Sequence, residues 1–150
     1  MQVLADEWIS IRPGTDTALL LALAYVMIVH QVHDQDFLDT YCVGFDRYHM
    51  PSGAPREDNF KDYVLGTYDQ TPKTPDWASK ICGVSPEKIE QLALEMATVK
   101  PMTMRASQAP ARTDNGARFV QAFYTVGWMT GNVGVLQVVR LATWCLEGHH

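Results

Sequence analysis

Cysteine is scarce in this sequence, and its few cysteines lie far apart. The three are Cys42, Cys82 and Cys145, and no Cys-x-x-Cys pair occurs. Without such a pair, the sequence supports neither a zinc site nor an iron–sulfur cluster held by this chain. We therefore interpret Cys42 and Cys82 as small hydrophobic residues of the interior.

Positive charge is in deficit as well. The chain has 12 lysines and arginines against 17 aspartates and glutamates, and its formal net charge is −5. Such a chain lacks the basic stripe that releases counterions from nucleic acid, so we expect no nucleic-acid partner. Asp6 and Glu7 follow the first residues at once, without a basic leader, so we also expect no targeting signal.

Long hydrophobic runs are missing, too. The apolar run over residues 18–29 is shorter than the ~20 residues that a membrane-spanning helix needs. It belongs to a predicted helix over 16–32 whose apolar residues lie on nearly every side, which indicates burial on several faces. Because a small domain has few elements to cover such a helix, the pattern favours the interior of a larger protein.

The residues that are present predict one globular, mainly helical domain. The chain has 150 residues, of which 47% are hydrophobic and 19% are charged. Asp34, Thr74 before Pro75, and Ser85 before Pro86 are typical of helix starts, because their side chains can cap a first turn. The predicted helices cover residues 16–32, 34–42, 59–65, 75–83, 86–98 and 116–129.

Two short segments have the pattern of strands. Ile9 and Ile11 alternate with Ser10 and Arg12, and residues 102–105 form a second candidate. Helices separate the two segments, so we expect them to lie parallel. The predicted fold class is mainly α with a small parallel β element (α/β), comprising about five to six helices and two short strands. We expect it to be a fragment of a larger α/β dinucleotide-binding-like domain.

The turn after the first predicted strand is a candidate ligand site. Pro13 and Gly14 end the strand, and Thr15 or Asp16 can cap the helix that follows. The free N–H groups and the dipole of a first helical turn attract anions and polar groups. Asp16 can also accept hydrogen bonds from a ring with N–H donors, such as guanine. A plain strand–turn–helix with a capping aspartate is the alternative.

A second junction, from Arg105 to Asn115, has the same order of strand, loop and helix. In open parallel sheets, ligands bind beyond the carboxyl ends of the strands. We therefore expect the two junctions to share one pocket.

No other group of residues indicates catalysis, and we assign neither catalytic nor metal-binding residues. His30 and His33 lie three residues apart. They could bind a metal ion as a pair. We favour the alternative that they lie at the C-terminal end of a helix, where the helix dipole stabilises a histidine. No motif joins Ser107, His33 and Asp114 into a hydrolase site.

Several segments, in order along the chain, resemble a known protein family. They are Ala5-Asp6-Glu7-Trp8-Ile9, Arg12-Pro13-Gly14-Thr15-Asp16, residues 37–46, 73–78 and 83–89, Pro110-x-Arg112-x-x-Asn115-Gly116, and Thr130-Gly131-Asn132-Val133-Gly134. Their order and spacing resemble the catalytic subunits of the dimethyl sulfoxide reductase family, and above all the bacterial anaerobic dimethyl sulfoxide reductases. The likeness covers about residues 3–134.

The resemblance implies a cofactor and the loops that hold it. In this family such a domain binds one guanine dinucleotide arm of a molybdenum bis(molybdopterin guanine dinucleotide) cofactor. The first loop matches Gly14, Thr15 and Asp16, with Asp16 expected at the guanine edge. The second family loop reads Gly-Trp-Gly-Pro-Gln-Arg-x-x-Asn-Gly, and alanine replaces its second glycine here, so the added Cβ can obstruct close approach. The candidate contacts in this second loop are Ala109, Pro110, Arg112 and Thr113.

The resemblance also implies that the chain is part of something larger. Residues 1–134 correspond to an internal segment of a molybdenum-dependent reductase of sulfoxides or N-oxides. They contribute cofactor-binding loops and are not catalytic alone. The family's amino-terminal cysteine cluster and its molybdenum ligand have no match, so we expect neither cofactor nor iron–sulfur cluster to be bound by the segment itself. Residues 135–150 depart from the family and end in a sequence typical of a cloning tail.

For the parent protein, the resemblance implies further subunits and a location. The expected partners are the rest of the catalytic subunit, an iron–sulfur electron-transfer subunit and a membrane anchor subunit, at the periplasmic face of the bacterial inner membrane. The segment alone is expected to expose apolar surface and to self-associate. The alternative is a small helical protein-interaction module without a ligand, because the chain has no convergent acid, base or nucleophile.

Overall fold

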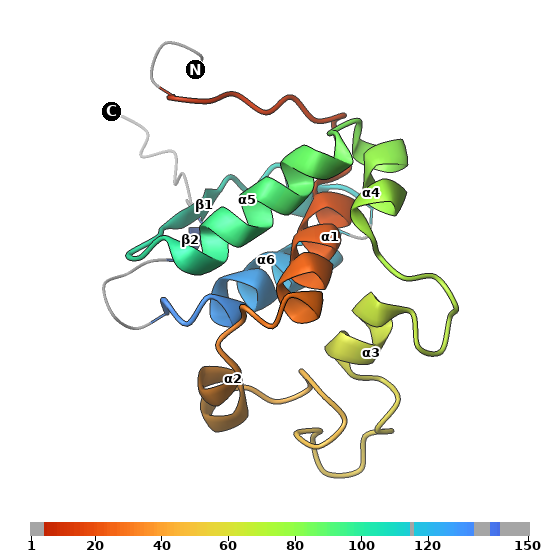
Figure 1. The fold of residues 1–150 in the computed structure, drawn as a ribbon. Coiled ribbons are helices and arrows are strands. Elements are labelled where there is room, and N and C mark those ends of the chain that lie inside the picture. Colours follow the sequence, from red (N-terminus) through yellow and green to blue (C-terminus); the bar gives the residue numbers. More distant parts are fainter. Residues whose placement is uncertain (1–4, 115, 134–138, 142–150) are drawn as a thin grey trace, which may run out of the picture.

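A computed structural model describes residues 5–114, 116–133 and 139–141 of the chain. The predicted fold class is confirmed, because helices dominate and two short strands, β1 and β2, pair in parallel. The elements in chain order are α1 Asp16–Val29, α2 Gln35–Tyr41, α3 Phe60–Leu65, α4 Pro75–Cys82, α5 Pro86–Thr98, β1 Met104–Ala106, the 3-10 helix η1 Pro110–Arg112, α6 Gly116–Met129 and β2 Val139–Leu141 (Figure 1).

The predicted helix starts are confirmed at three caps. The side chain of Asp34 accepts the N–H of Phe37 at 2.9 Å, at the start of α2. The hydroxyls of Thr74 and Ser85 do the same for α4 and α5, each followed by a proline in the first turn. These caps satisfy N–H groups that a helix cannot satisfy internally, which is why their positions were readable from sequence.

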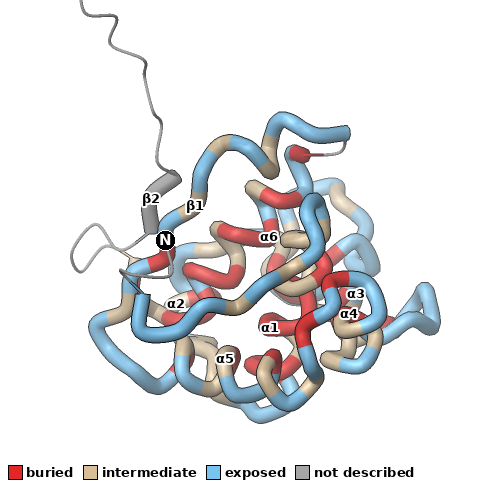
Figure 2. The backbone as a smooth tube through the Cα atoms, turned by 90° about the horizontal axis from the view of Figure 1, so that it is seen from above, coloured by how far each residue is buried: buried red, intermediate tan, exposed pale blue. Residues whose placement is uncertain are grey.

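Helix α1 lies at the centre of the molecule. It packs against α3, α4, α5 and α6, which surround it in Figure 1. Its buried residues run from Leu20 to Ala24 and from Val26 to Ile28, and Figure 2 shows the buried backbone gathered around it. The sequence pattern favoured the interior of a larger protein, but within this chain four helices already pack against α1. The chain covers α1 with its own helices.

Residues 9–12 form no strand, so this prediction is wrong. Their burial alternates as expected, with both isoleucines half-buried and Ser10 and Arg12 exposed. A strand also needs a neighbour for its backbone hydrogen bonds. Here the N–H of Arg12 donates instead to the carbonyl oxygen of Cys82, at 2.9 Å, at the end of α4. The strand expected at 102–105 is present as β1, and its parallel partner is β2.

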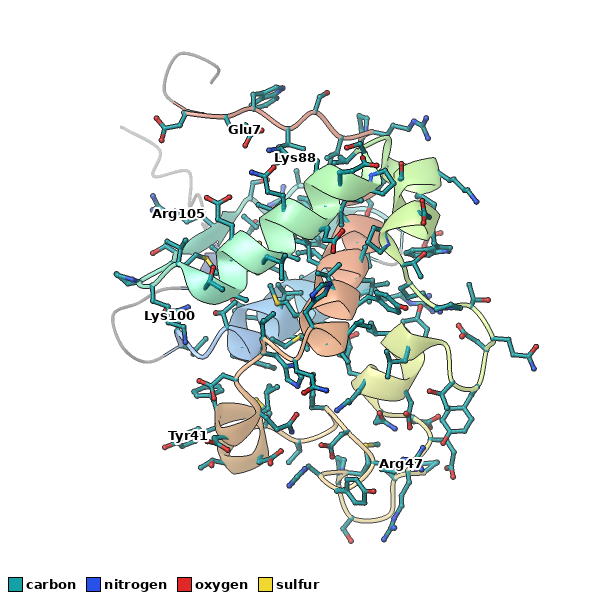
Figure 3. All side chains as sticks on the ribbon, in the orientation of Figure 1. Glu7, Tyr41, Arg47, Lys88, Lys100 and Arg105 are labelled. Carbon is teal, nitrogen blue, oxygen red and sulfur yellow. The ribbon has the colours of Figure 1, made fainter. Side chains whose placement is uncertain are left out.

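The segment before α1 lies along the outside of α5. Figure 3 shows Glu7 above Lys88, and the carboxylate of Glu7 lies 2.5 Å from the Nζ of Lys88. Of the cysteines, Cys82 is fully buried and Cys42 half-buried. Cys145 lies outside the described residues, as does most of the expected tail 135–150. No helix among the described residues is both long and apolar enough to cross a bilayer.

The contacts of Arg12 predict a measurable effect on stability. Its Nη1 donates to the carbonyl oxygens of Lys80 (2.8 Å) and Ile81 (3.1 Å), and a cation there also favours the helix dipole. We expect R12M to lower the free energy of unfolding by about 1 kcal/mol, measured by urea denaturation. The matched control is R56M, at an exposed arginine with no side-chain hydrogen bond among the described residues. Equal stability of R12M and R56M would contradict this role.

Candidate functional site

The loop before α1 leaves open space for a ligand. Gly14 has φ +78°, a left-handed conformation that favours glycine, and no atom lies within 4 Å of the position that a Cβ would take. The expected side-chain cap is absent, because Thr15 has ψ 11° and not the extended conformation typical of a capping residue, and its hydroxyl donates to the carbonyl oxygen of Arg12 at 2.6 Å. That part of the prediction is wrong. The first turn of α1 therefore has no side-chain cap, although the backbone carbonyl oxygen of Thr15 accepts the N–H of Ala18 at 3.1 Å.

The loop before α6 is held tightly against the helix. The N–H of Gly116 donates to the carbonyl oxygen of Thr113 at 3.0 Å, and the Thr113 hydroxyl donates to that of Pro110 at 2.8 Å. A Cβ at position 116 would overlap the carbonyl oxygen of Ala111. Glycine therefore allows η1 and the start of α6 to approach closely.

The two loops meet at one small cavity of about 210 Å³, which we call the junction cavity. Of the predicted contacts, the structure brings together Gly14, Asp16, Pro110 and Thr113. The other three, Thr15, Ala109 and Arg112, are not among its lining residues. The remaining lining residues are Thr17, Asp114, Gly116, Arg118 and Phe119.

Helix packing, rather than a sheet edge, brings the two loops together. A common pocket was expected at the carboxyl ends of two parallel strands, and the two loops do share a cavity. However, residues 9–12 form no strand, so no sheet edge brings the loops together. Instead α1 and α6 pack against each other, and the first turn of each helix contributes to the cavity. Asp16 begins α1 and Gly116 begins α6, so the two N-terminal ends face the same space.

Sequence reasoning missed Arg118 as a lining residue. The signal that could have found it is its position in the first turn of a helix, as the third residue of α6. A cation there opposes the positive end of the helix dipole. The first turn of α6 has no acidic residue to offset it.

A larger cavity, of about 710 Å³, lies next to the junction cavity between α1, α3 and α6. Thr17 and Arg118 line both. Three carboxylates, those of Glu57, Asp58 and Asp69, stand in its wall. Despite its smaller volume, the junction cavity is the stronger candidate, because both predicted loops contribute to it.

A second polar cluster lies beside α2. One oxygen of Asp39, one of Asp46 and the Nδ1 of His49 lie within 4.8 Å of one another, close enough to hold a cation. Asp46 Oδ1 accepts His49 Nδ1 at 2.9 Å and the backbone N–H groups of Tyr48 and His49 at 2.9 and 3.1 Å. These bonds account for the cluster as a turn closed around the Asp46 carboxylate, so its geometry supports a structural role.

The two histidines at the end of α1 have separate partners. His30 Nε2 lies 3.2 Å from Glu90 Oε1. His33 Nδ1 lies 3.1 Å from the carbonyl oxygen of Met27, in the last turns of α1, and its Nε2 lies 2.9 Å from Gln35 Oε1. This arrangement favours the interpretation of a helix end over that of a metal-binding pair.

Comparison with known proteins gives similar chains but no matching family model. The chain is 47% identical over 131 residues to dimethyl sulfoxide reductase DmsA of Haemophilus influenzae and likewise to that of Escherichia coli. It is 34% identical over 134 residues to a trimethylamine-N-oxide reductase of Haemophilus influenzae. The alignments cover 87% or more of this chain and 16% or less of each relative.

A solved structure shares the fold. Acetylene hydratase from Pelobacter acetylenicus superposes with a TM-score of 0.66 at 26% identity, over 87% of this chain and 15% of that one. The chain thus spans about one sixth of the length of the proteins that it matches.

The pKa of Asp46 predicts how stability depends on pH. Partial burial raises this pKa, but hydrogen bonds from the His49 side chain and from the N–H groups of Tyr48 and His49 outweigh burial, so it lies below 3.8. The unfolded pKa of an aspartate is about 3.9. A carboxyl group whose pKa is lower in the folded protein stabilises the fold at pH values above this unfolded pKa, and the stabilisation is lost as the pH falls through the folded-state pKa.

We therefore expect D46N to be less stable than wild type by about 1–3 kcal/mol near neutral pH, and the difference to shrink as the pH falls below the unfolded pKa of Asp46 and through its lower folded pKa. Urea denaturation followed by circular dichroism at several pH values measures this, with D6N as the exposed control. A difference between D46N and wild type that stays constant with pH would contradict the assigned cause.

Proposed function

The chain belongs by sequence to the dimethyl sulfoxide reductase family of molybdopterin oxidoreductases, and on this premise we propose that it is an internal segment of a catalytic chain. In our proposal, the segment supplies the site for one guanine end of the molybdenum cofactor. The parent protein reduces a sulfoxide or an N-oxide. The segment itself supplies no catalytic residue.

One observation carries this proposal. Two loops that are far apart in the sequence, each before the first turn of a long helix, line one cavity. Gly14 and Asp16 contribute from one side, and Pro110 and Thr113 from the other. A helix N-terminus favours a polar ligand, and two such ends facing one space strengthen that preference.

The residues present fit a guanine ring. The open space beside Gly14 lets a ligand approach the backbone, and the first turn of α1 is not covered by a cap. Asp16 is half-buried and offers carboxylate oxygens, which accept the N–H groups of guanine. A volume of about 210 Å³ is below the ~300 Å³ typical of a whole drug-sized ligand. It therefore suits one ring system, with the rest of the cofactor outside it.

The rest of the function belongs to the parent protein. When bound, the cofactor supplies the oxygen-atom transfer chemistry at molybdenum, while the polypeptide binds and orients it. We propose that the parent also carries an iron–sulfur cluster and works with an iron–sulfur electron-transfer subunit and a membrane anchor at the periplasmic face of the inner membrane. Residues 1–134 would then be the family segment and 135–150 an atypical tail.

The test of this function is a titration with GDP. We expect saturable amide shifts in nuclear magnetic resonance spectra at Gly14 and Asp16. We expect D16N to weaken the affinity at least about tenfold, because it removes the charge of the acceptor carboxylate. D76N, in the first turn of α4, is the matched control and should bind as wild type does. Absence of any shift at millimolar GDP would favour the alternative of an interaction module without a ligand.

A segment taken from a larger protein also leaves apolar surface exposed. Tyr41, Val43 and Tyr48 are 75%, 77% and 80% exposed, and Figure 3 shows Tyr41 projecting outward from α2. Because the parent would cover such side chains, we expect the segment to self-associate. Size-exclusion chromatography should show an apparent mass that rises with concentration, and less so for the triple variant Y41S/V43S/Y48S. A compact monomer at high concentration would count against this expectation.

A further inference from the structure

The junction cavity contains charged groups of both signs. Asp16 at the start of α1 and Asp114 just before α6 offer carboxylates, and Arg118 in the first turn of α6 offers a guanidinium. All three line a cavity no larger than one ring system. A single ring bound there therefore meets acceptors from the carboxylates and donors from the arginine.

This combination matches the polar edges of guanine. Guanine carries an N1–H and an N2 amino group, which donate to carboxylates, and the acceptors O6 and N7, which an arginine binds in bidentate fashion. Adenine reverses part of this pattern, because it has an amino group in place of O6 and an acceptor at N1. An arginine facing that amino group meets a donor, and a carboxylate facing N1 meets a lone pair.

We propose that Arg118 reads the O6 and N7 edge of the base and makes the junction cavity selective for guanine over adenine. This inference rests on the proposed function and adds to it the residue that sets base specificity. Arg118 is exposed and lines the junction cavity, and its side chain takes part in no hydrogen bond or ion pair among the described residues, so its donors are available.

The alternative partner for Arg118 is a phosphate group, which the surrounding charges disfavour. Arg118 lines the junction cavity together with Asp16 and Asp114, and the larger cavity together with Glu57, Asp58 and Asp69. A phosphate drawn into either cavity would meet more negative than positive charge. A neutral base with donors and acceptors fits this environment better.

The experiment compares GDP with ADP by calorimetry on the full chain. We expect wild type to prefer GDP by about 5- to 150-fold, the discrimination typical of one bidentate pair between an arginine and guanine. R118M should weaken GDP binding by a similar factor and leave ADP binding unchanged, so that the preference disappears. R118K keeps the charge but lacks the planar fork, so most of the preference should also be lost.

Controls separate the possible outcomes. R105M removes an exposed arginine of β1 and should keep the full preference for GDP, while the circular dichroism spectrum of R118M should match that of wild type. If R118M weakens the binding of GDP and of ADP equally, Arg118 binds phosphate, and the inference about base selectivity is wrong while the proposed function stands. An unchanged preference of R118M for GDP would have the same consequence. If wild type binds no GDP, the proposed function itself fails, and the inference fails with it.

Discussion

Packing of four helices against α1 is the constraint on which the rest of the structure depends. These helices are contributed by segments spread over most of the chain, and they bury most of the residues of α1. Because so many of its residues are held in the core, the position of its first turn is fixed as well. The neighbouring α6 begins beside that first turn, which places two helix N-termini at one cavity. The candidate site is thus a consequence of how the core is packed.

Small local contacts then complete the site. Arg12 binds the last carbonyl oxygens of α4 and so holds the approach to Gly14 in an extended conformation without a sheet. Gly116 lets η1 lie directly on α6. Each contact involves a residue next to a candidate ligand-binding residue, so stability and binding share the same short segments.

The errors of sequence reasoning have physical causes. Residues 9–12 have the burial pattern of a strand, but alternation reports only which side chains face inward, and not whether a neighbouring backbone is available. The expected cap at Thr15 failed because its backbone does not take the extended conformation that aims a capping oxygen at the first turn. Ala109 and Arg112 come from a loop pattern of the family; they are not among the residues that line the junction cavity, and their contact with a cofactor stays a prediction. Arg118 was missed because no local pattern marks it except its unfavourable place in a first turn.

The sequence by itself determined the helices, their caps and the two loops, because caps, prolines, glycines and apolar periodicity act between residues that are neighbours in the chain. The resemblance to the reductase family could likewise be read from motifs in order. Only the tertiary structure decided that α1 is covered within this chain, that β1 pairs with β2, and that Asp16, Asp114 and Arg118 line one cavity. These facts depend on which distant surfaces pack together, and packing of that kind follows from the shape and volume of many side chains at once.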